Sequence, residues 1–280
     1  MKQRDASIMK LTNTFKPQKF FDSIVHVKEK TDWYNTDKQA NRDVLKKYFE
    51  DGHIDKAILT GMPGDNYEYT LKSARYISQN VVPVFSVEGK WLDGDIQYLK
   101  DIFRCYKSKG FRGVKIHPRF TGYAITHQHW LMVAEAAQSV GLFLMICTIH
   151  RAPVFPLGMS LHEALYDFCR KFKNLKIMLL HGGYYDLLAM SEVVRDLDNV
   201  LLDLSFTFMR FKKSSIALDA GYLFETLDRK ISIGTDYPEC SPVELFSSVD
   251  KYIISRDDIE LTPDKLNNIF YNNINEFIKL

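Results

Sequence analysis

The stretch Gly113-Val114-Lys115-Ile116-His117 decides the fold, because apolar and polar side chains alternate within a short β-rich run. Val114 and Ile116 suit a layer beneath helices, which turns Lys115 and His117 toward the axis of a barrel. A helical pattern over residues 126–140 follows. A strand followed by a helix is the repeating unit of a parallel sheet.

Runs of this kind recur along the chain, with amphipathic helical patterns between them. The eight runs are 20–27, 56–60, 81–87, 113–117, 142–149, 175–181, 200–205 and 231–236, and helical patterns include 37–49, 126–140, 161–172 and 242–254. The alternation predicts one (β/α)8 (TIM) barrel domain spanning residues 1–280. An open doubly wound sheet is the alternative, but no glycine fingerprint follows the first run.

Composition narrows the function. The 37 basic and 35 acidic side chains nearly cancel, which argues against nucleic-acid and membrane-surface binding and favours a small-molecule partner. The four cysteines are scattered, as expected of reduced thiols, and no segment approaches the roughly 18 apolar residues of a membrane span. We therefore expect a cytoplasmic protein; association of identical copies is left open.

Chemically active side chains stand at the predicted strand ends, where TIM-barrel active sites are built. Alternation places Asp236 at the barrel mouth. His26 lies near the end of the first run, on the same face as Asp22 and Ile24, and His181 ends the sixth run. A lone histidine is more often an ordinary core residue, but three such groups at strand ends favour one site. An inward lysine at Lys115 indicates either a buried ion pair or substrate binding.

These strand ends resemble those of the amidohydrolase-2 branch of the amidohydrolase superfamily. The matching segments are Phe21-Asp22-Ser23-Ile24-Val25-His26, Gly110 to Pro118, His181-Gly182-Gly183, Gly234-Thr235-Asp236-Tyr237-Pro238 and Leu266 to Asn273. Two departures stand out. Ile24 occupies the place of one of the family's two first-strand histidines, and Cys147 that of its fifth-strand histidine. Cys147 could equally be a small buried hydrophobe.

The resemblance implies a divalent metal, most simply zinc, at a degenerate site. Its ligands would be His26, Cys147, His181 and Asp236, with Asp236 also acting as base. A metal-free variant is the alternative, in which Asp236 activates water while His181 and Lys115 polarise a carbonyl.

The remaining candidates would bind substrate. They are His117, which faces the barrel axis at the end of the fourth run, and Arg119, His150, Arg151 and Arg210, which follow strand ends and could gather around a carboxylate or phosphate. The alternative is that these side chains lie at the solvent-exposed rim of the barrel and bind no substrate. We therefore expect an enzyme that hydrolyses a small anionic amide, ester or lactone. A decarboxylase-type lyase and a barrel that only binds its ligand are the other hypotheses.

Overall fold

The structure is a computed structural model, and it describes residues 15–34, 36–149 and 160–279. Eight parallel strands form a single sheet in the order of the sequence. They are β1 (Phe21–Val25), β2 (Lys56–Thr60), β3 (Val81–Ser86), β4 (Gly113–Ile116), β5 (Phe143–Cys147), β6 (Ile177–Leu180), β7 (Val200–Asp203) and β8 (Ile231–Ser232). The predicted (β/α)8 barrel is confirmed. The eighth strand is shorter than the predicted run 231–236.

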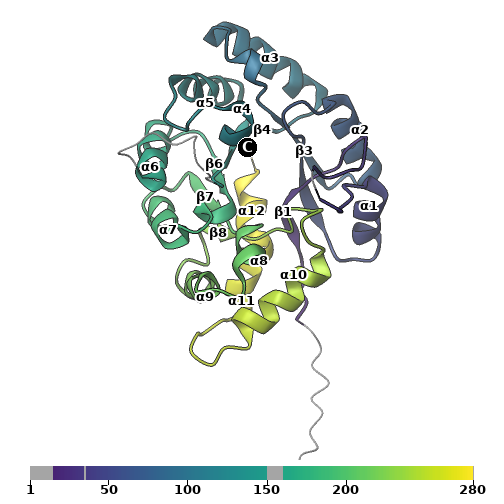
Figure 1. Ribbon diagram of the computed structural model, residues 1–280, viewed down its shortest axis with the longest axis vertical. Helices are drawn as coiled ribbons and strands as arrows, with labels where there is room; N and C mark the ends of the chain where they lie inside the picture. The colour runs from purple at the N-terminus through teal and green to yellow at the C-terminus, as the bar shows by residue number, and fades with distance from the viewer. Residues whose placement is uncertain (1–14, 35, 150–159, 280) are drawn as a thin grey trace, which may run out of the picture.

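Helices surround the strands (Figure 1). They are α1 (Arg42–Glu50), α2 (Tyr67–Ile77), α3 (Ile96–Lys109), α4 (Pro118–Thr121), α5 (Gln128–Val140), α6 (Leu161–Lys171), α7 (Leu187–Arg195), α8 (Thr207–Phe211), α9 (Ile216–Thr226), α10 (Pro242–Val249), α11 (Pro263–Asn267) and α12 (Asn273–Phe277). Reciprocal caps start α6 at Ser160 and α10 at Ser241. Each serine side chain accepts a hydrogen bond from the backbone N–H of a glutamate three residues later, and the side chain of that glutamate accepts from the serine's backbone N–H. Within the described residues, no helix is long and apolar enough to cross a membrane.

Two apolar layers hold the barrel together. Val114 and Ile116 belong to the large layer between strands and helices, as the alternation predicted. A second layer fills the barrel itself and includes Ile24, Met145 and Met178. Helix α12 covers the end opposite the strands' carboxyl termini, since Phe277 joins this inner layer. Figure 1 shows α12 in yellow near the centre of the ring of helices. One end of the barrel is therefore sealed, and the other is left for a site.

The seam between β8 and β1 is closed differently from the other strand pairs. Beyond Ser232 the backbone pairs with β1 through a single bridge, in which His26 N donates to Tyr237 O at 2.8 Å. The buried carboxylate of Asp22 accepts from Thr235 N at 2.9 Å and from its hydroxyl at 2.6 Å. The side chain of Asp22 thus replaces a backbone hydrogen bond between neighbouring strands. The pairing of β1 with β2 is also irregular between Asp22 and Val25.

This close approach depends on the missing side chain of Gly234. A Cβ there would lie 2.3 Å from Ser23 Oγ and 2.6 Å from Asp22 Oδ1. We expect Gly234→Ala to lower the free energy of unfolding by about 1–3 kcal/mol through overpacking. Gly89→Ala is the matched control, because a Cβ at Gly89 has no atom within 4 Å. Urea unfolding of both variants is the measurement, and equal stabilities would contradict this view of the seam.

Candidate active site

A cavity of about 480 Å³ opens at the carboxyl ends of the strands. It gathers most of the sequence-predicted site residues with an aromatic wall. The lining side chains are His26, Trp33, Tyr34, Thr36, Met62, Lys115, His117, Arg119, Phe120, Ile149, His181, Phe206, Arg210, Asp236 and Glu239. Its volume is that of a site for a small molecule.

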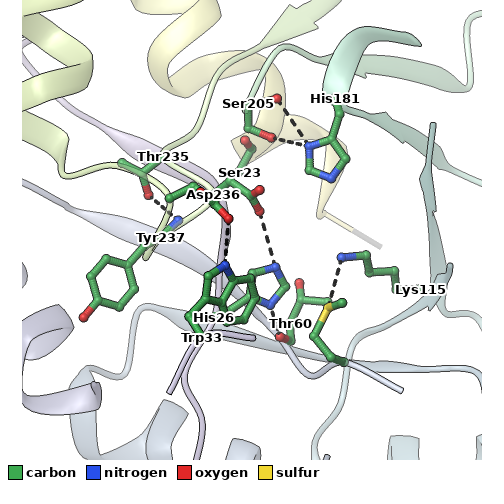
Figure 2. Close-up of polar contacts among 12 residues, drawn as sticks. Ser23, His26, Trp33, Thr60, Lys115, His181, Ser205, Thr235, Asp236 and Tyr237 are labelled. Atoms are coloured by element: carbon green, nitrogen blue, oxygen red, sulfur yellow. Dashed lines mark hydrogen bonds and ion pairs between the residues drawn. The ribbon is translucent and has the colours of Figure 1, made fainter. Parts of the chain in front are cut away.

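His26 and Asp236 meet on one side of this cavity. His26 Nδ1 donates to the carbonyl of Thr60 at 2.6 Å, because a carbonyl oxygen can only accept. His26 Nε2 then faces Asp236 Oδ1 at 3.4 Å, which is an ion pair when Nε2 also carries a proton. The ring stacks on Trp33 with centroids 5.0 Å apart. Figure 2 shows the imidazole beside Thr60 and Trp33.

Asp236 is a carboxylate at neutral pH. Burial alone would raise its pKa. The positive charges that His181, His26 and Lys115 carry when protonated, together with the bond from His26, outweigh burial and lower the pKa to about 2. Asp236 has a φ of 50°, in the left-handed region that disfavours side chains. The left-handed backbone accompanies its position at the mouth, as at many functional sites.

His181 follows β6 on the opposite side and is held by the end of β7. Its Nδ1 lies 3.3 Å from Ser205 O and 3.2 Å from Ser205 Oγ. Ser205 Oγ donates to the buried carboxylate of Asp203, which also accepts from Ser23 Oγ of β1. Because Ser205 O can only accept, Nδ1 carries the proton, and the lone pair of Nε2 is left free. Figure 2 shows the imidazole beside Ser205.

His181 and Asp203, the two buried titratable groups that Ser205 connects, have shifted pKa values. Burial lowers the pKa of His181 to about 4, so its imidazole is neutral at pH 7. Burial raises the pKa of Asp203 to about 6, although its serine donors act in the opposite direction. Sequence reasoning missed Asp203 and Ser205. Their alternate positions in the run 200–205 could have identified them by the parity rule used for Lys115.

Lys115 points into the cavity as predicted and is only 1% exposed. Its Nζ lies 3.7 Å from Met62 Sδ, a weak acceptor. No ion pair within the described ranges includes Lys115, which speaks against the alternative of a buried ion pair. Burial is the main cause that lowers the pKa of its amine.

Further cationic and donor groups line the same cavity. Arg119 and Arg210 reach it, and in the part of the chain that the structure describes neither has a carboxylate partner. His117 Nδ1 and Arg119 Nε are buried without a hydrogen-bond partner there. Burial is the main cause that holds the pKa of His117 well below its usual value, and Lys115 adds to the effect when it is protonated. His150 and Arg151 lie outside the described residues.

An aromatic loop after β1, which sequence reasoning missed, forms the cavity's outer wall. Trp33 Nε1 donates to Glu239 Oε1 at 2.7 Å, and Lys38 Nζ lies 2.7 Å from Glu239 Oε2. Tyr34 packs on Phe120 with ring centroids 5.3 Å apart. Glu239 is thus neutralised by Lys38, which leaves Asp236 as the carboxylate available to a ligand in the described lining.

The predicted metal ligands do not assemble as expected. Those four were His26, Cys147, His181 and Asp236. Across residues 15–34, 36–149 and 160–279, no group of three or more His, Cys, Asp or Glu side chains could hold a metal ion. A catalytic zinc needs about three such ligands. The geometry gives the metal prediction no support.

Two side chains explain why. Cys147 packs with Ile149 and Tyr184 in a small apolar cluster, and burial raises the pKa of its thiol, which disfavours the thiolate that a metal needs. Ile24, at the place of a family histidine, is buried in the inner layer of the barrel. The described residues therefore do not fit a metal in this arrangement, and the chemical steps below use only side chains of the protein.

Comparisons with known proteins agree with the fold. The sequence profile of the amidohydrolase family, Amidohydro_2, matches residues 92–280. No curated protein matches the chain by sequence.

Solved structures cover almost the whole chain. One is a probable 2-pyrone-4,6-dicarboxylic acid hydrolase from Acinetobacter baumannii with citric acid bound (TM-score 0.65, 13% identity, 93% of this chain and 99% of that chain). Another is an amidohydrolase from Burkholderia multivorans with bound zinc (0.63, 14%, 94% and 99%). A third is 5-carboxyvanillate decarboxylase from Novosphingobium aromaticivorans, complexed with manganese and 4-hydroxy-3-methoxy-5-nitrobenzoic acid (0.55, 14%, 94% and 96%). At these identities the likeness shows the fold.

The tautomer and charge of His181 can be measured directly. We expect ¹⁵N NMR to find the proton on Nδ1 and a neutral ring that titrates with a pKa of about 4. Since this pKa lies below the ordinary histidine value of 6.5, the unfolded chain binds the proton more readily than the folded one. The free energy of unfolding therefore decreases as the pH falls from 6.5 to 4. His181→Gln assigns the resonance. A proton on Nε2, or a midpoint at 6.5 or above, would contradict the assignment.

Proposed function

Because the chain belongs to the amidohydrolase family, we propose that it hydrolyses a small, carboxylate-bearing ester or lactone, with Asp236 as the base that activates water. One observation carries the proposal. The ionised Asp236 shares a cavity with Lys115, Arg119 and Arg210, none of which has a carboxylate partner in the described chain.

The reaction can be written with this chain's own residues. Asp236 accepts a proton from water as the water oxygen attacks the substrate's carbonyl carbon. Lys115 donates a hydrogen bond to the carbonyl oxygen, where negative charge develops, and the free Nε2 of His181 accepts the water's second hydrogen. When the carbon–oxygen bond breaks, Asp236 returns its proton to the leaving oxygen. The products are a carboxylic acid and an alcohol, joined in one molecule if the substrate is a lactone.

A carboxylate base favours particular substrates. Asp236 stays ionised at neutral pH because its pKa is lowered, but a carboxylate is a weak base compared with hydroxide. Water activated so weakly attacks an ester or lactone carbonyl more readily than an amide, whose carbonyl is less electrophilic. We therefore place esters and lactones before amides.

The charges in the cavity favour an acidic substrate. Arg119 Nε is buried and unpartnered among the described residues, and a guanidinium binds a carboxylate with paired hydrogen bonds. The relative from Acinetobacter baumannii was solved with citric acid, which is also a carboxylate. We propose that Arg119 and Arg210 bind the substrate carboxylate while Lys115 contacts the reacting carbonyl.

The family relation and the fold are compatible with other chemistry. A decarboxylase shares the fold, and a barrel that only binds its ligand would keep the same cavity. A panel of carboxylated lactones and aromatic acids separates these cases. Ring opening supports the proposal, carbon dioxide release from aromatic acids supports a lyase, and ligand binding without turnover supports a binding barrel.

We expect Asp236→Asn to lower kcat by at least about 100-fold on a hydrolysed lactone, because an amide keeps the shape but cannot accept water's proton. Glu239→Gln is the matched control, since it changes a second carboxylate of the same cavity and keeps an acceptor for Trp33. Circular dichroism and thermal melts verify folding. Activity of Asp236→Asn within a few-fold of the parent would rule out Asp236 as the base.

A further inference from the structure

Lys115 is buried among residues from the ends of several strands. These residues either contact its amine or interact with it electrostatically. They are Met62 after β2, His117 and Arg119 after β4, Cys147 of β5, His181 after β6, Asp203 of β7 and Asp236 after β8. Among the described residues, none forms an ion pair with its amine, and its nearest hydrogen-bond contact is the sulfur of Met62 at 3.7 Å. Within that part of the chain, the nitrogen therefore faces the cavity without a strong hydrogen-bond acceptor.

This environment favours the neutral amine. Burial lowers the pKa of Lys115 and outweighs the opposing fields of Cys147 and Asp236, while the guanidinium of Arg119 acts in the same direction as burial. A lysine that is desolvated or set beside another cation is an activated nucleophile toward carbonyl groups. The hydrolysis proposed above uses Lys115 only as a hydrogen-bond donor, so its nucleophilic capacity is unused there.

We propose that Lys115 forms an imine with the carbonyl carbon of a small 3-oxo acid bound in this cavity. The carboxylate of such an acid suits Arg119 and Arg210, which line the same cavity. The 480 Å³ of the cavity accommodates a molecule of this size. This activity goes beyond the hydrolysis proposed above and does not depend on it, because the nucleophile is a protein amine and not water.

The step balances without a further reactant. The nitrogen of Lys115 attacks the carbonyl carbon, its two protons pass to the carbonyl oxygen, and that oxygen leaves as water, so that a carbon–nitrogen double bond remains. Asp236 and His181 face the same cavity and can carry these protons. The imine nitrogen then takes up a proton from solvent. In a 3-oxo acid, this protonated imine accepts the electron pair of the bond to the carboxylate, which leaves as carbon dioxide. The enamine takes up a proton at carbon, and water then releases the ketone and frees Lys115.

Borohydride trapping with acetoacetate tests the proposal on the intact protein. Reduction of the imine fixes the probe on the lysine as a secondary amine, with a gain equal to the mass of acetoacetate less one oxygen atom. If carbon dioxide leaves first, the label is an isopropyl group. We expect the isopropyl label on Lys115 in peptide mapping. Because the cavity would hold the probe beside the amine, Lys115 should be labelled at least about tenfold faster than the exposed Lys90.

Two variants provide the comparison. Lys115→Arg keeps a long side chain that donates hydrogen bonds but cannot form the imine, and it should abolish both the label in that peptide and the release of carbon dioxide from acetoacetate. Lys90→Arg should change neither. Peptide mapping of the labelled parent protein decides the question even if the Lys115→Arg variant does not fold. Labels spread over exposed lysines with Lys115 spared would overturn the imine, and a label on Lys115 that keeps its carboxylate, with no carbon dioxide released, would overturn the decarboxylation.

Discussion

The barrel depends on how β8 is joined to β1. Elsewhere neighbouring strands are joined by backbone pairing, but β8 ends after Ser232, and the segment beyond it is held by the carboxylate of Asp22 and one backbone bond from His26. Burial raises the pKa of Asp22 to about 7 despite its bonds to Thr235, so this seam is maintained at a cost in desolvation. The residues in and directly after β1 also position the site, because Ser23 of β1 donates to Asp203 and His26, which follows β1, lies 3.4 Å from Asp236.

This constraint explains why the site's polar groups are so closely linked. Asp236 can approach His26 only because the chain turns away from the strand direction after Thr235, with a positive φ at Asp236. His181 and Phe206 also have positive φ values, at the ends of β6 and β7. Such conformations cost about 1–3 kcal/mol each and persist where the surroundings fix them. Here the surrounding network runs from β1 to β7 and β8.

The sequence predicted the fold well because strand alternation is a local property. Val114 and Ile116 face the helices and Lys115 the cavity, as their spacing required. The site was predicted only in part. Asp236, His26, His181, Lys115, His117, Arg119 and Arg210 do share one cavity, but the distances between strand ends depend on the irregularity in β1 and on the short β8. The role of Cys147 was undecidable from spacing, since a ligand and a buried hydrophobe occupy the same strand position. The Trp33 loop carries no periodic pattern, so its place over His26 could not be read from the chain.

Hydrogen exchange at the seam tests the central claim most directly. The amides of His26 and Thr235 donate to Tyr237 O and to Asp22 Oδ1. If these bonds close the barrel, both amides should exchange only through global unfolding, at rates matching those of central strand amides such as Leu144. Exchange of Thr235 and His26 at the rates of exposed loop amides, with Leu144 still protected, would contradict the claim that this seam holds the barrel and its site together.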